Sequence, residues 1–338
     1  MPRPLADQVV VITGASSGIG RCAARHLAAR GARVVLTARR AAALDALARE
    51  IESDGGRARA IAGDVRREAD LAAVADTAVE TFGRIDTWVN NAGVYIYGSV
   101  TDLSLDDFRD VLATDLVGVI NGTRQALRYM LPARAGVVIQ VSSILGKRGA
   151  PFTGPYSAAK AGIDGFCDAL RAELWGTGVH VATLYVPSVD TPIYQHARTR
   201  FPTKPKPVPP LHDPIETARR IAELAVRPQR EAYIGVFRLL YLGLDLLAPG
   251  FTDWLLHHAA GVMRGRLPAD GDNIDHPMPT VPPTVRGGWG GKRLKGIALE
   301  ELALALPGET VLAAGLAGYA AGRWWGRRGW RRTAKRRV

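Results

Sequence analysis

The chain has 338 residues, of which 47% are hydrophobic and 22% charged. This composition supports a packed core and excludes a chain that is disordered throughout, and the length fits one large α/β domain with an extension or two small domains. The net charge is +12, but residues 323–338 carry eight basic side chains and no acid, which leaves about +4 for the preceding 322 residues. The positive charge therefore belongs mainly to a tail and does not indicate a nucleic-acid groove in the body.

The two cysteines, Cys22 and Cys167, are far apart and belong to no CxxC or Cys/His cluster. We therefore expect neither a disulfide framework nor a metal site, which fits a reducing compartment. No apolar segment of the signal-peptide type precedes Asp7, so a cytoplasmic protein is expected.

Strands are predicted to alternate with helices over the first 235 residues. Short apolar and β-branched runs predict buried strands over 8–13, 33–38, 58–62, 85–90, 136–141, 180–186 and 231–234. Helices are predicted over 18–30, 41–53, 71–82, 105–114, 116–130, 156–175 and 214–226. This alternation predicts an α/β fold with a doubly wound parallel sheet, whose ligands lie at the carboxyl ends of the strands.

The pattern changes after about residue 200. Residues 201–214 contain six prolines and are interpreted as a loop, a candidate substrate flap. We divide the chain into a domain over 1–235 and a helical, partly irregular extension over 236–338. Within the extension we expect a Pro/Gly-rich linker, an apolar segment and a basic tail, at 267–292, 310–322 and 323–338.

A glycine-rich loop follows the first predicted strand and opens the first predicted helix. It has the sequence Thr13-Gly14-Ala15-Ser16-Ser17-Gly18-Ile19-Gly20. Glycines let backbone amides approach a pyrophosphate closely, and the N-terminus of the helix adds a favourable dipole. Such glycines also close tight turns, but the strand before and the helix after them favour dinucleotide binding. The residues expected to contact the coenzyme are Gly14, Ser16, Ser17, Gly18, Ile19 and Gly20.

Four motifs in this order resemble those of the short-chain dehydrogenase/reductase family. They are TGASSGIG at 13–20, NNAG at 90–93, a serine at Ser143, and the YxxxK pattern of Tyr156 and Lys160. The resemblance covers about residues 6–235. It implies a Rossmann fold that binds NAD(P), interconverts a carbonyl and an alcohol on a small molecule, and commonly forms homo-oligomers.

The resemblance also assigns further residues to the coenzyme. Asp64 occupies an acidic position that contacts adenine, and Thr191 a position beside the nicotinamide carboxamide. Ser188 replaces a usual glycine, so the local turn is expected to differ. The set outside the glycine-rich loop is Asp64, Val65, Asn91, Ala92, Gly93, Tyr156, Lys160, Pro187, Val189 and Thr191.

The end of the second predicted strand bears on the choice of dinucleotide. Ala38 stands where relatives that use NAD carry an aspartate for the ribose 2′-hydroxyl. Arg39 follows, and a guanidinium at this point can hold a 2′-phosphate by charge-assisted hydrogen bonds. The alternative is that Arg39 and Arg40 are a solvated pair at the start of a helix. We expect NADP(H) to be preferred over NAD(H).

Tyr156 and Lys160 are four residues apart and share one face of their predicted helix. A phenol has an ordinary pKa near 10, and a nearby ammonium is expected to lower it. The resemblance assigns Tyr156 the proton exchange with the substrate oxygen, Ser143 the orientation of that oxygen, and Lys160 the nicotinamide ribose. Each residue alone has a structural explanation, in packing, solvation or the end of a strand, but together they favour catalysis.

Asp115 departs from the family, which often has asparagine at this position to support a water-linked proton path from the lysine. We expect Asp115 to belong to the catalytic group, to pair with Lys160 and to alter the pH profile. A dinucleotide-binding scaffold or sensor with little turnover is the alternative function that Asp115 and the long tail suggest.

The expected substrate walls are apolar or aromatic, which favours a lipophilic ketone or alcohol. The alternative for these residues is packing in the core or in a dimer. They are Tyr95, Ile96, Tyr97, Ile144, Leu145, Phe152, Ile193 and Tyr194.

The C-terminal segment raises the question of a membrane. Residues 310–322 are fewer than the ~20 that span a bilayer, but Trp324, Trp325 and the basic tail fit contact with a membrane surface. The alternative is a helix packed on the body. No nucleic-acid partner is expected.

Overall fold

The computed structural model describes residues 2–235, 243–260, 264–269, 271–276, 278 and 283–289. The predictions for the apolar segment 310–322 and the basic tail 323–338 fall outside these residues.

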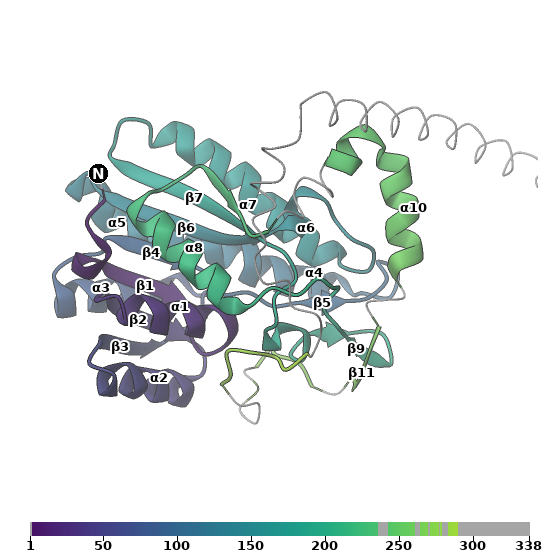
Figure 1. The fold of residues 1–338 in the computed structure, drawn as a ribbon, viewed down its shortest axis with the longest axis horizontal. Helices are drawn as coiled ribbons and strands as arrows, with labels where there is room; N and C mark the ends of the chain where they lie inside the picture. Colours follow the sequence, from purple (N-terminus) through teal and green to yellow (C-terminus); the bar gives the residue numbers. More distant parts are fainter. Residues whose placement is uncertain are drawn as a thin grey trace, which may run out of the picture.

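A parallel sheet of seven strands in the order β10-β7-β6-β4-β1-β2-β3 forms the centre of the molecule (Figure 1). Its inner strands, such as β1 and β4, are buried on both faces, which explains their mostly apolar sequences, whereas the edge strand β3 is partly exposed. The predicted α/β, doubly wound Rossmann architecture is therefore confirmed. The strands are β1 (Val9–Thr13), β2 (Arg33–Ala38), β3 (Arg57–Ala62), β4 (Thr87–Asn90), β6 (Gly136–Ser143), β7 (Val179–Val186) and β10 (Glu231–Tyr233).

Helices cover both faces of this sheet. The helices α1 (Gly18–Ala28), α2 (Ala41–Ser53) and α8 (Pro214–Val226) pack on one face. The helices α3 (Glu68–Phe82), α5 (Gly118–Ala133) and α7 (Gly154–Glu173) pack on the other. The chain leaves β1 towards β2 and β3 and later returns to the opposite side of β1 with β4. This change of direction opens a crevice at the carboxyl ends of β1 and β4.

A π-helical turn, η2 (Ala113–Val117), joins α4 (Leu105–Leu112) directly to α5. The sequence predicts two helices with a break near Asp115, whereas the structure continues the helix through a wider turn. Ser104 caps α4, since its hydroxyl accepts a hydrogen bond from the Asp107 amide at 3.1 Å. Single π turns often occur at functional sites, and this one contains Asp115.

Short elements that the sequence does not reveal surround the carboxyl ends of the strands. Strand β5 (Ile96–Tyr97) pairs with β8 (Arg198–Thr199), and β9 (Thr203–Pro205) pairs with β11 (Arg264–Pro268). The predicted loop 201–214 thus contains a strand. Further elements are η1 (Leu5–Asp7), α6 (Ile144–Lys147), η3 (Pro192–Tyr194) and α10 (Pro249–Ala259).

Residues 267 and 268 of the predicted linker 267–292 belong to strand β11, whereas its other described residues are irregular and pack on the body. Ile274 is fully buried, and Val285 packs against the main core. Figure 1 shows this yellow-green segment running below the carboxyl ends of the central strands.

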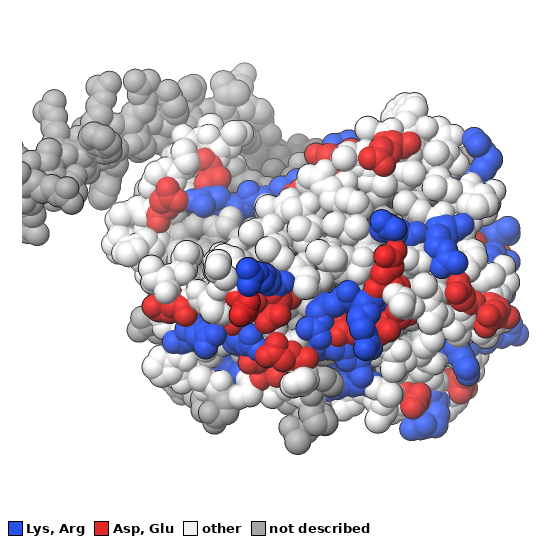
Figure 2. Space-filling model, turned by 180° about the vertical axis from the view of Figure 1, so that it is seen from behind, with Lys and Arg blue, Asp and Glu red and all other residues white. Residues whose placement is uncertain are grey.

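Basic and acidic side chains are intermixed over the face shown in Figure 2. Many basic side chains of the described residues form ion pairs, such as Arg67 with Asp70 at 2.6 Å. Positive and negative charges therefore offset each other over much of the described part of this face.

Candidate active site

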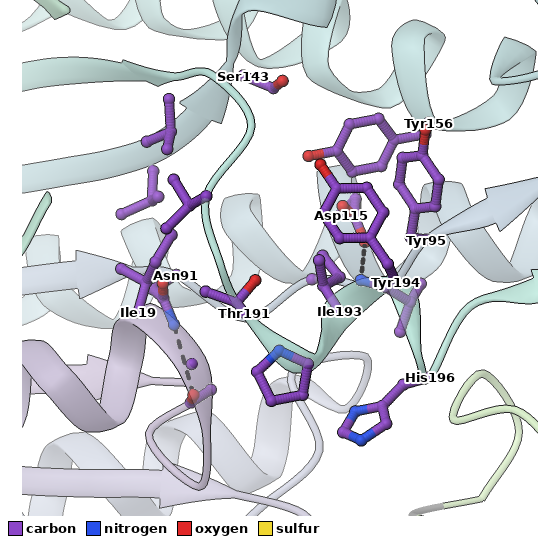
Figure 3. Close-up of a pocket in the computed structure, with 18 of the residues that line it drawn as sticks. Ile19, Asn91, Tyr95, Asp115, Ser143, Tyr156, Thr191, Ile193, Tyr194 and His196 are labelled. Carbon is purple, nitrogen blue, oxygen red and sulfur yellow. Dashed lines mark hydrogen bonds between the residues drawn. The ribbon is translucent and has the colours of Figure 1, made fainter. Parts of the chain in front are cut away.

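A cavity of about 340 Å³ lies at the carboxyl ends of the central strands (Figure 3). The structure brings every predicted site residue except Gly20 to its lining. These residues are Gly14, Ser16, Ser17, Gly18, Ile19, Arg39, Asp64, Val65, Asn91, Ala92, Gly93, Asp115, Ser143, Tyr156, Lys160, Pro187, Val189 and Thr191.

The glycine-rich loop and the NNAG segment form one packed unit. The Asn91 side-chain amide donates to the Thr13 carbonyl at 3.0 Å, and the Thr13 hydroxyl accepts hydrogen bonds from the Asn91 and Ala92 amides, both at 3.0 Å. Gly14 has a φ of +67°, and a Cβ there would lie 2.7 Å from the Ala92 Cα. Gly20 supports this unit from behind, because a Cβ on it would meet the Gly14 carbonyl oxygen. The resulting shallow backbone cradle at a helix N-terminus fits a dinucleotide pyrophosphate.

Three charged side chains meet at the end of the cavity next to β2. The Asp64 carboxylate accepts hydrogen bonds from Arg66, the shortest at 2.6 Å. Burial raises the pKa of Asp64, but the Arg66 hydrogen bonds and the charges of Arg66 and Arg39 outweigh it, so the pKa is lowered overall. The Arg39 guanidinium donates to the carbonyls of Asn273 and Ile274, the latter at 2.9 Å. The sequence did not reveal the Arg66 contact or these carbonyls.

The residues predicted to act in catalysis lie at the other end of the cavity. Lys160 Nζ is 3.2 Å from Asp115 Oδ2 and 5.4 Å from the centre of the Tyr156 ring. Asp115 is fully buried, and its Oδ1 accepts a hydrogen bond from the Val94 amide at 2.8 Å. The π turn thus directs Asp115 towards Lys160, which α7 supplies together with Tyr156. The ion pair expected between Asp115 and Lys160 is present.

The acidity of Tyr156 differs from the sequence prediction. Burial raises the pKa of the phenol, and the charge of Asp115 raises it further, while a hydrogen bond with Ser143 lowers it. The net shift is upwards, so the prediction that Lys160 lowers this pKa is wrong for this arrangement. The main reason is burial of the phenol, and the charge of Asp115 adds to it. Burial likewise raises the pKa of Asp115, against the attraction of Lys160.

Aromatic rings surround the Tyr156 phenol. The Tyr95 ring lies edge-on to Tyr156 with centroids 4.9 Å apart and edge-on to Tyr194 at 5.5 Å (Figure 3). Of the predicted substrate walls, Tyr95, Ile144, Leu145, Ile193 and Tyr194 line the cavity. The other predicted walls, Ile96, Tyr97 and Phe152, do not line it and pack in the neighbouring hydrophobic cluster. The loop before α8 and helix α10 contribute Val208, Leu256 and Ala260.

His196 is a cavity residue that sequence reasoning missed. Its side chain is buried, and its Nε2 has no hydrogen-bond partner among the described residues. Burial, followed by the charges of Arg40 and Lys204, lowers the pKa of His196 to about 4. The imidazole is therefore neutral near pH 7. A single histidine after a proline-led turn gives no sequence signal of this placement.

Comparisons with known proteins agree with this geometry. A family model described as short chain dehydrogenase matches residues 8–201. The chain belongs to the short-chain dehydrogenase family.

Several curated relatives support this assignment. The chain is 37% identical over 258 residues to an uncharacterized oxidoreductase, YxnA, of Bacillus subtilis, covering 75% of this chain and 72% of the relative. It is 34% identical to a 3-oxoacyl-[acyl-carrier-protein] reductase of Synechocystis, over 68% of this chain and 93% of that protein. It is 36% identical to a cis-4-hydroxycyclohexanecarboxylate dehydrogenase of Sinomonas cyclohexanicum, over 67% and 92% respectively.

This short-chain dehydrogenase is therefore an NAD(P)-dependent oxidoreductase that acts between an alcohol and a carbonyl. Within the described residues, no helix combines the length and apolar character needed to cross a bilayer. The same residues contain no group of three or more His, Cys, Asp or Glu side chains that could hold a metal ion.

Proposed function

We propose that this dehydrogenase uses NADP(H) to interconvert a lipophilic ketone and its alcohol, with Tyr156 as the proton donor or acceptor. The observation that carries the proposal is the meeting of Tyr156, Ser143 and Lys160 at one end of a cavity whose other end is a dinucleotide cradle. Two relatives support reversible chemistry at a carbonyl carbon. One is named a 3-oxoacyl-[acyl-carrier-protein] reductase and the other a cis-4-hydroxycyclohexanecarboxylate dehydrogenase.

Each residue of the catalytic group has a distinct task in this proposal. A bound nicotinamide supplies or accepts the hydride. In the direction of reduction, Tyr156 Oη donates its proton to the substrate oxygen, and the Ser143 hydroxyl hydrogen-bonds to the same oxygen and orients it. Lys160, held by Asp115, places a positive charge beside the phenol and stabilises the phenolate that remains. Tyr95 and Tyr194 exclude water from this end of the cavity.

The raised pKa of Tyr156 suits proton donation. A protonated phenol is ready to reduce a ketone near pH 7, whereas oxidation of an alcohol first requires the phenolate. We therefore expect faster ketone reduction at neutral pH and faster alcohol oxidation as the pH rises.

Arg39 is the residue proposed to select NADP(H). Equilibrium titration of the wild type with NADPH and NADH, followed by the same titrations of Arg39→Ala, tests this assignment. NADPH is expected to bind at least 10-fold more tightly than NADH, because NADH lacks the charge-assisted contact with Arg39, which contributes about 1.5–3 kcal/mol. The Arg39→Ala variant is expected to lose this difference. Tighter binding of NADH by the wild type would contradict the assignment.

The size of the apolar cavity leads us to propose a lipophilic substrate. A series of ketones with a constant reacting group and growing apolar side chains tests the proposal through kcat/KM. Each buried methylene contributes ~0.8 kcal/mol to binding, which corresponds to about a fourfold gain. A kcat/KM that stays flat or falls along the series would show that the walls do not recognise apolar groups.

We propose a cytoplasmic homo-oligomer that uses the helices within 105–131 and 156–175, and contact of its C-terminal segment with a membrane surface. Detergent-free fractionation of chains with and without 297–338 tests the membrane contact. An unchanged soluble fraction would reject it.

A further inference from the structure

A segment near the end of the described chain lines part of the proposed coenzyme cavity. We call residues 271–276 and 283–289 the C-terminal strap. Figure 1 shows these yellow-green residues passing below the carboxyl ends of the central strands, and Asn273 lines the cavity itself. The strap therefore forms part of the coenzyme site, although no sequence motif connects it with the dinucleotide.

The first half of the strap is held by buried and charged contacts. Ile274 is fully buried in the hydrophobic cluster that also contains Tyr95 and Tyr156. Arg198 binds the Asp272 carboxylate, with Nε 3.0 Å from Oδ2, and also binds Asp275. Asp272 Oδ1 in turn accepts a hydrogen bond from the Ile274 amide at 2.9 Å. These contacts fix the backbone whose carbonyls face Arg39.

The second half of the strap is held at the glycine-rich loop and at the end of the cavity proposed for the nicotinamide. The Gly18 amide, the first of helix α1, donates to the Thr284 carbonyl at 2.9 Å. The Trp289 indole donates to the Thr191 carbonyl at 3.0 Å, and Gln195 Nε2 donates to the Gly287 carbonyl at 2.6 Å. The strap thus contacts both ends of the proposed dinucleotide path.

The contacts with Arg39 compete with the proposed coenzyme. Both Nη groups of Arg39 donate to strap carbonyls, Nη1 to Ile274 at 2.9 Å and Nη2 to Asn273. A 2′-phosphate held in a bidentate pair would use at least one of these two nitrogens as a donor. A phosphate adds the attraction between opposite charges, which a neutral carbonyl lacks, so it is the stronger acceptor and displaces the carbonyls. NAD(H) has no group that can do so.

We propose that the first half of the strap, residues 271–276, is a coenzyme-selectivity element that the 2′-phosphate of NADP(H) displaces from Arg39 and that NAD(H) leaves in place. This inference rests on the proposed use of Arg39 for the 2′-phosphate. It follows that part of the NADP(H) binding energy is spent on freeing Arg39, and that weakening the strap strengthens NADP(H) binding without changing NAD(H) binding.

Hydrogen–deuterium exchange of the whole wild-type chain tests the displacement. The Asn273 amide donates to the His196 carbonyl at 3.2 Å and the Ile274 amide to Asp272, so both report on the closed strap. At saturating coenzyme, we expect residues 271–276 to exchange at least fivefold faster with NADPH than with NADH. Equal protection with both coenzymes bound would overturn the inference, since the strap would then be a fixed wall.

Asp272→Ala provides a second, independent readout. Loss of the Arg198 contact and of the Ile274 cap is expected to lower the Kd for NADPH about threefold or more and to leave the Kd for NADH unchanged. Asp106→Ala is the matched control, because Asp106 pairs with Arg109 on the surface at 2.8 Å. An unchanged or higher Kd for NADPH in Asp272→Ala would contradict the inference. Failure of wild-type NADPH to bind more tightly than NADH would instead contradict the proposed coenzyme itself, and the inference with it.

Discussion

Asp115 sets the charge balance around Lys160 and Tyr156 in the proposed active site. The carboxylate is fully buried 3.2 Å from Lys160 Nζ, so it serves as the counter-ion of a lysine that is itself buried. A buried charge is costly unless it is paired, and Asp115 and Lys160 form such a pair. The negative charge of Asp115 also raises the pKa of Tyr156.

Replacing Asp115 by asparagine tests this balance. The Asp115→Asn variant removes a negative charge that raises the phenol pKa, so the pKa of Tyr156 is expected to fall. Alcohol oxidation requires the phenolate, and its rising pH–rate limb should therefore move to lower pH. The falling limb of ketone reduction should move in the same direction, because reduction requires the protonated phenol.

The pH dependence of kcat/KM in both directions measures these shifts. Asp106→Asn serves as a control, since its carboxylate is exposed on α4. Limbs that stay at the wild-type pH in Asp115→Asn would exclude Asp115 from the proton chemistry.

The sequence predicts some residues of the site and misses others for a physical reason. Tyr156 and Lys160 lie four residues apart on one helix, so local periodicity brings them together, and the family motif adds Ser143 at the end of β6. His196 and Arg66 act through neighbours that only the folded chain supplies. The direction of the Tyr156 pKa shift was misjudged mainly because burial, which has no local sequence signature, raises it, and also because the charge of Asp115 raises it further.

Within the helices, a glycine can be required for close packing, as at the start of the helix that follows the glycine-rich loop. Gly20 and Gly165 both lie inside helices, but a Cβ on Gly20 would meet the Gly14 carbonyl oxygen, whereas nothing lies within 4 Å of a Cβ on Gly165. The same substitution is therefore expected to have opposite effects at the two positions.

Alanine at these positions provides a matched pair. Gly165→Ala is expected to stabilise the protein by ~0.5–1 kcal/mol, the ordinary helix preference for alanine. Gly20→Ala is expected to destabilise it by about 1–3 kcal/mol through overpacking and to weaken coenzyme binding. Chemical denaturation measures the free energies of unfolding. Equal effects of the two substitutions would show that the close approach of Gly20 to Gly14 has no energetic consequence.

The buried central strands were predicted more accurately than the short strands around them. The central strands were predicted to within about two residues because a strand buried on both faces needs a continuous apolar run. The pairs β5–β8 and β9–β11 are only two to five residues long, too short to show a period. The π turn at Asp115 was missed because it depends on the partner that its side chain finds, Lys160 on another helix.

At the scale of the whole molecule, the extension is joined to the domain that ends at 235. Ile274 and Val285 contribute to its hydrophobic clusters, and Arg198 binds two carboxylates from beyond residue 270. The division of the chain at 235 and 236 remains our proposal for the limit of the Rossmann domain. We therefore expect these contacts to stabilise the domain, so that it unfolds more easily without the strap.

A pair of truncations tests the contribution of the extension. Ending the chain at residue 235 removes the burial of Ile274, worth ~1.5–3 kcal/mol, and partners of Arg198. The melting temperature is expected to fall by roughly 5 °C or more. Ending the chain at 296 retains every described contact and serves as the control. Equal melting temperatures of the two truncated chains would show that the strap adds nothing to stability.

The central claim is that the Tyr156 phenol transfers the proton, and Tyr156→Phe tests it most directly. NADPH oxidation with a lipophilic ketone should fall about 100- to 10,000-fold in kcat/KM, the usual contribution of a general acid. NADPH binding, measured by titration, should change little, because the ring and its packing against Tyr95 are retained. A variant that binds NADPH and still turns over within a few-fold of the wild type would contradict the account.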